Sequence, residues 1–164
     1  MGMLVQGRWQ NQDLSGFKRD GETVRFGGGF QNWISADGPT KFTPDPERYS
    51  LYCNRTCPWS HRTLIVRELK GLSQVIDIVL LEPAMGVESW WFGKSGQYRD
   101  PELGATHLHQ LYSHGDPEFT GRVTIPVLWD KCSGTIVNND SGMIARILNS
   151  EFNSIAVHPE VDFY

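Results

Sequence analysis

The sequence predicts an α/β domain with the element order β-α-β-α-β-β-α, and three observations favour this class. A strand pattern, a helix pattern and a second strand pattern follow one another within about 35 residues, which is typical of a right-handed βαβ unit with parallel strands. Two later strand patterns are joined by a short turn at 131–134, as in a β-hairpin. The chain has 164 residues, enough for one domain with a core of its own.

The first three elements form the βαβ unit. Residues 48–53 alternate and carry aromatic side chains, as strands do. A helix is expected over 58–70, and the pair Lys70-Gly71 is typical of a helix end. Residues 75–81 form an apolar, β-branched run, which indicates a buried strand.

The second half of the domain is predicted to contain a helix, a hairpin and a final helix. A glycine-rich loop with a tryptophan cluster comes first, and long loops inside compact domains are usually functional. The predicted elements are the loop 82–100, a helix over 101–114, strands over 123–130 and 135–137, and a helix over 142–149 with Asn139 or Asp140 as its N-cap.

Two segments flank this domain, which is predicted to span 48–150. Residues 1–47 are rich in Gly, Asp, Asn, Gln and Pro and are expected to form an extended arm, and residues 151–164 an interdomain linker. The arm is expected to pack its aromatic side chains onto the domain; these are Trp9, Phe17, Phe26, Phe30, Trp33 and Phe42.

Cys57 is the strongest candidate for a catalytic residue, because it lies at a strand-to-helix turn directly before Pro58. Proline is favoured at the first helical position, which makes Cys57 the predicted N-cap. There its sulfur faces unpaired backbone N–H groups and the positive end of the helix dipole, near Arg55 and Arg62, and this favours the thiolate. The thiolate attacks sulfur and carbon, so Cys57 is predicted to be a nucleophile. The alternative is a small buried hydrophobic residue, as most free cysteines are.

The remaining cysteines favour one-thiol chemistry, completed by an external thiol. Ser60 stands where a Cys-x-x-Cys motif would place its second cysteine. Cys53 is expected to be buried in its strand, and Cys132 to be incidental in the hairpin turn. Three cysteines make no disulfide framework in a chain of this length, so we expect a reducing, cytoplasmic compartment.

The composition also excludes several classes of function. A net charge of −4 without a basic run argues against nucleic-acid binding, and no apolar run is long enough to span a bilayer. The histidines His107, His109 and His114 are close in sequence. On one helix, residues 107 and 114 share a face and residue 109 does not, so no metal site is expected.

The element order, with Cys57-Pro58 opening the first helix and Ile125-Pro126 opening the third strand, is the layout of the thioredoxin-like fold of glutathione transferases. A proline at the start of a strand that faces a cysteine site is a candidate cis bond. Asp140 and Ser141 begin the last helix, where this fold meets the γ-glutamyl end of glutathione. Capping alone and capping combined with binding both fit the local sequence.

With these residues in place, the chain resembles the N-terminal half of the glutathionyl-hydroquinone reductases, the Xi class of glutathione transferases. The matching stretches are Phe30–Gly38, Arg48–Tyr52, Cys57–Ile65, Leu69–Leu72, Leu108–Tyr112, Gly121–Lys131 and Thr135–Ser141. The resemblance implies Cys57 as the nucleophile. It implies a glutathione site lined by Trp90, Arg122, Ile125 through its backbone, Asp140 and Ser141.

The chain departs from the family pattern at three places. The family usually has Glu where this chain has Asp140, and an aliphatic residue where it has Cys53. Members also carry an all-helical C-terminal domain, which supplies the aromatic-substrate pocket, whereas this chain stops at Tyr164.

The resemblance implies an enzyme that reduces glutathionyl-hydroquinones to hydroquinones through a mixed disulfide between Cys57 and glutathione. Glutathione is the expected cosubstrate, no metal is expected, and the partners are glutathione and glutathionylated quinols, with a homodimer at full length. Two alternatives stay open: a catalytically silent thioredoxin-fold binding domain, and a general glutathione-dependent thiol transferase.

Overall fold

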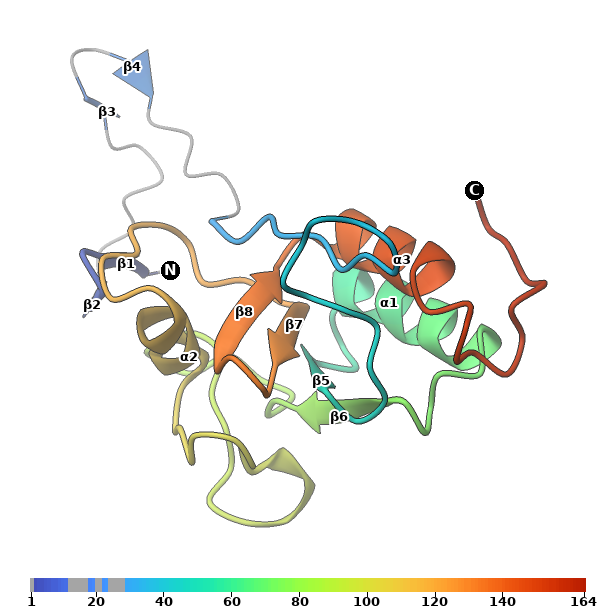
Figure 1. Ribbon diagram of the computed structural model, residues 1–164. Helices are drawn as coiled ribbons and strands as arrows, with labels where there is room; N and C mark the ends of the chain where they lie inside the picture. The colour runs from blue at the N-terminus through green and yellow to red at the C-terminus, as the bar shows by residue number, and fades with distance from the viewer. Residues whose placement is uncertain (1, 12–17, 20–21, 24–28) are drawn as a thin grey trace.

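A four-stranded mixed sheet forms the centre of the computed structural model, which describes residues 2–11, 18–19, 22–23 and 29–164 (Figure 1). Its strand order is β6-β5-β7-β8. The strands are β5 (Tyr49–Cys53), β6 (Ile76–Leu80), β7 (Val127–Asp130) and β8 (Thr135–Asn138). β5 pairs in parallel with β6 and antiparallel with β7, and β7 pairs antiparallel with β8. The predicted βαβ unit and hairpin are therefore both present.

The helices cover both faces of this sheet. α1 (Pro58–Leu69) and α3 (Ser141–Ser150) lie side by side on one face, and α2 (Leu108–Gly115) lies on the other (Figure 1). Alternate residues of a strand point to opposite faces, so β5 sends Leu51 to the α1/α3 side and Tyr52 to the α2 side. A short 3-10 helix, η1, spans Gly96–Tyr98. Within the described ranges, no helix has the length and apolar composition needed to cross a membrane.

Two predicted elements begin later than expected. The helix predicted from residue 101 starts only at Leu108, because the buried Asp100 carboxylate holds the preceding turn. It accepts N–H hydrogen bonds from three residues of that turn, at 2.9–3.2 Å: Glu102, Leu103 and Ala105. The strand predicted from residue 123 starts at Val127, after Pro126, which has no N–H to give to the sheet.

The N-terminal segment is more folded than an extended arm. Residues 3–10 form a hairpin of β1 (Met3–Val5) and β2 (Arg8–Gln10), and a two-stranded pair follows, β3 (Lys18–Arg19) with β4 (Glu22–Thr23). Leu4 is fully buried and exchanges two backbone hydrogen bonds with Gly121, both 3.0 Å. Of the predicted aromatic contacts, Phe30 and Phe42 are buried, and Trp9 and Trp33 pack against the core. Phe17 and Phe26 lie outside the described residues.

The C-terminal segment, predicted as a linker, packs against the end of α1. Phe152, at its start, is fully buried with its ring edge-on to Tyr49 of β5. Lys70 is the helix C-cap and is also buried; its Nζ donates to Asn153 Oδ1 at 2.6 Å and to the carbonyl of Val161 at 2.8 Å. Burial lowers the pKa of Lys70. The division of the chain into arm, domain and linker stays a prediction.

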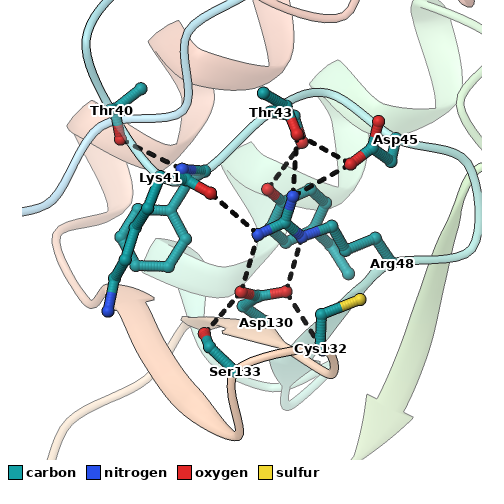
Figure 2. Close-up of polar contacts among 10 residues, drawn as sticks. Thr40, Lys41, Thr43, Asp45, Arg48, Asp130, Cys132 and Ser133 are labelled. Carbon is teal, nitrogen blue, oxygen red and sulfur yellow. Dashed lines mark hydrogen bonds and ion pairs between the residues drawn. The ribbon is translucent and has the colours of Figure 1, made fainter.

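A buried ion pair fastens the segment before β5 to the β7–β8 turn (Figure 2). The Arg48 guanidinium holds both carboxylate oxygens of Asp130, at 2.8 and 3.0 Å. Its remaining N–H groups donate to Thr43, Asp45 and the carbonyl of Lys41. Burial acts to raise the pKa of Asp130, but hydrogen bonds from Arg48 and Ser133 outweigh it, so this pKa lies below its ordinary value.

We expect Asp130→Ala to lower the free energy of unfolding by about 3–5 kcal/mol, because Arg48, whose side chain is only 12% exposed, then keeps only the exposed Asp45 as a counter-charge. The matched control is Asp77→Ala. Asp77 is 64% exposed and pairs with Lys131 at 2.7 Å on the surface, so its loss should cost at most about 1 kcal/mol. Urea unfolding at neutral pH measures both changes.

The same variants give a second readout in acid. Since folding depresses the pKa of Asp130, its contribution is complete above the unfolded value of about 3.9 and is lost as pH falls through the folded value. Asp130→Ala should lack this part of the acid sensitivity. If Asp130→Ala and Asp77→Ala lowered the free energy of unfolding equally at neutral pH, the importance of Asp130 for stability would be contradicted.

Candidate active site

The turn between β5 and α1 places Cys57 at the N-terminus of α1, as predicted. Cys57 is the N-cap, with φ −91° and ψ 117°, and Pro58 is the first helical residue. The buried Asn54 holds the turn: its Nδ2 donates to the carbonyls of Leu81 and Glu82, and its Oδ1 accepts from the N–H of Thr56 at 2.8 Å. No pattern in the sequence predicted this role for Asn54.

Ser60 completes the turn from inside the helix. It is fully buried, and its Oγ accepts from the N–H of Asn54 at 3.3 Å. The position that would carry a second thiol in a dithiol motif is therefore a structural contact here. This arrangement agrees with one-thiol chemistry.

The three cysteines lie in different environments. Cys57 is 9% exposed, whereas Cys53 is fully buried in β5 and Cys132 is exposed in the β7–β8 turn. Burial raises the pKa of Cys53 to about 12, so its thiol stays protonated near neutral pH. Cys53 is thus a buried core residue, as expected from its place in the strand.

A second wall of the site comes from the segment before β7. The Ile125–Pro126 bond is cis, which confirms the prediction. Ile125 belongs to the same apolar cluster as Cys57, and Trp90 packs against that cluster. The fold therefore brings these three predicted site residues into one neighbourhood.

The buried Asn139 amide connects this wall to the start of α3. Its Nδ2 donates to the Tyr112 hydroxyl at 3.0 Å and to Thr124 Oγ1 at 3.2 Å, and its Oδ1 accepts from the N–H of Phe30 at 3.3 Å. The Tyr112 hydroxyl in turn donates to the carbonyl of Thr124 at 2.8 Å. The two segments that line the site are held in a fixed relation by side-chain hydrogen bonds.

Asp140, rather than Asn139, caps α3. Its Oδ1 accepts from the N–H of Met143 at 2.8 Å. Gly142 follows, and a Cβ there would come within 3.8 Å of Arg62 Nη1 and 3.2 Å of Asp140 Oδ1. The Arg62 guanidinium therefore lies near the first turn of α3, which Asp140 caps, so both signs of charge are present at this helix end.

A cavity of about 360 Å³ opens between the starts of α1 and α3. Its lining residues are Trp59, Arg62, Thr124, Ile125, Asn139, Asp140, Ser141 and Gly142. Three of the predicted glutathione-site residues, Ile125, Asp140 and Ser141, are among them. Arg122 is exposed and does not line the cavity. Cys57 and Trp90 do not line it either; Trp90 packs against the apolar cluster that contains Cys57.

Sequence reasoning missed Trp59, Arg62, Thr124 and Asn139 as cavity residues. Trp59 and Arg62 are three residues apart on α1, so they share a face, and Arg62 lies 4.8 Å over the Trp59 ring. That spacing is a sequence signal for a paired surface. It does not reveal that the pair faces α3, because this depends on how the two helices pack.

Known proteins agree with this fold. Residues 56–151 match the family described as glutathione S-transferase, N-terminal domain. The glutathionyl-hydroquinone reductase YqjG of Escherichia coli (strain K12) is 41% identical over 163 residues, which cover 94% of this chain and 50% of that protein. The chain spans about half the length of the curated relatives that it matches.

Two solved structures are similar over almost the whole chain. The Xi-class glutathione transferase from Natrialba magadii is 38% identical, with a TM-score of 0.85 over 100% of this chain and 49% of that one. The glutathione-bound structure of YqjG from Escherichia coli K-12 is also 38% identical, with a TM-score of 0.80 over 99% of this chain and 49% of that one.

We expect iodoacetamide to alkylate Cys57 faster than Cys132 at pH 6.5, although Cys132 is the more exposed thiol. The reason is that a helix N-terminus favours the thiolate, which is the reactive form. Mass-spectrometric mapping after a brief reaction gives the order, with buried Cys53 as the unreactive internal control. Rapid labelling of Cys132 with Cys57 protected would remove the basis for a nucleophilic Cys57.

Proposed function

Because this chain belongs to the glutathione S-transferase family and matches its N-terminal domain, we propose that it supplies the glutathione site and the nucleophile of a glutathionyl-hydroquinone reductase. The predicted resemblance to the Xi class and the predicted thioredoxin-like fold are both confirmed. The observation that carries the proposal is the placement of Cys57 at the N-terminus of α1, two residues before Trp59, which lines the cavity at the start of α3. A relative that shares 41% identity is named for this reaction.

The proposed reaction has two half-reactions. The Cys57 thiolate attacks the sulfur of a glutathionyl-hydroquinone, and the bond between that sulfur and the aromatic ring breaks. The ring carbon takes a proton and leaves as hydroquinone, and Cys57 keeps the glutathionyl group as a mixed disulfide. A second glutathione thiolate then attacks this disulfide, which yields glutathione disulfide and free Cys57.

The ends of the two helices would bind different parts of glutathione. The α-ammonium of the γ-glutamyl group fits the Asp140 carboxylate, and its α-carboxylate fits Ser141 and the free N–H groups of α3. Arg62 lies against the same turn and would add a positive charge for that carboxylate. The backbone of Ile125 would pair with the peptide part. Trp90 and Arg122 join the site through the family resemblance.

Further features are proposed for the whole enzyme. α1 exposes apolar side chains on one face, with Trp59 57%, Ile65 44% and Leu69 49% exposed. We propose that the helical domain implied by the family resemblance covers this face, and that the enzyme is a cytoplasmic homodimer. The free cysteines of the described chain are consistent with a reducing compartment.

The test follows each half of the chemistry on the 164-residue chain. Glutathione disulfide should add one glutathionyl group to Cys57, and Cys57→Ser should abolish the addition.

Asp140→Ala should weaken glutathione binding by about 1.5–3 kcal/mol in calorimetry, because it removes a charge-assisted hydrogen bond. Asp77→Ala, on the exposed side of β6, is the matched control and should bind normally. Circular dichroism confirms that each variant is folded, since losing the α3 cap also costs about 1 kcal/mol of stability.

The outcomes separate the alternatives. Release of hydroquinone from a glutathionylated quinol should be slow in this chain and should rise when the family's helical domain is added. No mixed disulfide on Cys57 would favour a silent binding domain. Faster reduction of ordinary glutathione mixed disulfides than of glutathionylated quinols by the two-domain form would favour a general thiol transferase.

A further inference from the structure

Two histidines and a glutamate converge at the N-terminus of α2, away from the cavity lined by α1 and α3. Glu88, His107 and His109 offer ligand atoms that all lie within 4.8 Å of one another. Glu88 Oε2 is 2.9 Å from His109 Nε2. The two imidazole rings stack, with centroids 5.4 Å apart and planes inclined by 16°.

The cluster exists because His107 is not part of the helix. It is the N-cap of α2, with φ −137° and ψ 147°, so helical spacing does not govern where its ring lies. The expectation that His107 and His109 point apart was based on helical spacing and is wrong for this pair. His114, the third histidine of the sequence analysis, instead has its ring 6.1 Å from that of Trp129.

Backbone contacts hold the three residues in place. The turn that contains Glu88 is closed by two hydrogen bonds between Gly86 and Ser89, at 2.9 and 3.2 Å. The loop then pairs with the start of α2, where the N–H of Leu108 donates to the carbonyl of Trp90 at 2.9 Å. Trp91 and His107 form an antiparallel bridge. The fold therefore sets the cluster before any ion binds.

Neighbouring side chains orient both imidazoles. The ring of Trp9 stacks on His109, with centroids 4.9 Å apart, and Thr106 Oγ1 lies 3.0 Å from His107 Nδ1. Contacts of this kind fix the ring orientation of metal-binding histidines.

We propose that Glu88, His107 and His109 bind one divalent transition-metal ion of the Zn²⁺ class. Two imidazoles and one carboxylate form a donor set that suits Zn²⁺, Co²⁺ and Ni²⁺, whereas Mg²⁺ and Ca²⁺ prefer oxygen ligands alone. Two ligand atoms bound at about 2.1 Å to a tetrahedral ion lie about 3.4 Å apart. The ligand atoms of the three residues lie within 4.8 Å of one another, so binding needs only a small side-chain rotation. Glu88 is 42% exposed, which leaves a route for the ion and a position for water.

A bound ion would connect α2 to the loop that contains Trp90. That loop reaches the Cys57 cluster, and α2 supplies Tyr112 to the Asn139 network, so the ion would brace two elements next to the active site. The proposal does not depend on the proposed reductase activity.

Calorimetric titration of the tag-free chain with Zn²⁺ tests the proposal. We expect one equivalent to bind, and Glu88→Gln, His107→Gln and His109→Gln each to weaken binding at least about tenfold. His114→Gln is the matched control, because it removes a histidine of α2 outside the cluster, and it should bind as the unchanged chain does. Cys57→Ser should also bind normally, since no thiolate is a ligand.

A second measurement uses the unchanged chain only, so it does not depend on whether the variants fold. Co²⁺ absorption spectra of the unchanged chain should show ligation by nitrogen and oxygen, without the charge-transfer bands of thiolate ligands. Absence of saturable binding near one equivalent would overturn the proposal. Equal affinity in the three cluster variants and His114→Gln, or thiolate bands with Co²⁺, would do the same, and the cluster would then be an ordinary ion pair beside a stacked histidine.

Discussion

The hydrogen bonds of the Asn139 side chain are the constraint on which the candidate site depends. Its amide joins the segment at Phe30, the hydroxyl of Tyr112 on α2 and the hydroxyl of Thr124 before the cis bond. A buried amide that lost one of these partners would carry the full cost of an unmet polar group, about 1–3 kcal/mol, so the network strongly favours one arrangement. Since Asp140 and α3 follow directly in the chain, this arrangement also fixes the helix end that lines the cavity.

Two helix N-termini meet at this site and have complementary roles. The start of α1 carries Cys57, which reacts as the thiolate. The start of α3 carries free N–H groups and the Asp140 carboxylate, and Arg62 of α1 lies near them. α1 and α3 pack side by side, so a ligand with a thiol at one position and a zwitterion at another can reach both (Figure 1). The same packing explains why the site can form from a single α/β domain.

Local rules predicted much of this arrangement, and long-range contacts account for the rest. The strands β5 to β8, the helices α1 and α3, the N-cap position of Cys57 and the cis bond before Pro126 follow from periodicity, capping and proline chemistry. The late start of α2 depends on the carboxylate of Asp100, and the packing of the C-terminal segment depends on Lys70. The position of Arg62 in the cavity depends on how α1 packs against α3, and the position of the His107 ring depends on its place as the N-cap of α2.

The central claim is that one thiol and one helix end, Cys57 and the start of α3, hold the same glutathione molecule. A crystal structure of the chain after reaction with glutathione disulfide tests this most directly. We expect a disulfide bond from Cys57 Sγ to the ligand, with the γ-glutamyl group against Asp140 and Ser141 in the cavity. A glutathionyl group attached to Cys132, or one attached to Cys57 but extending away from α3, would contradict it.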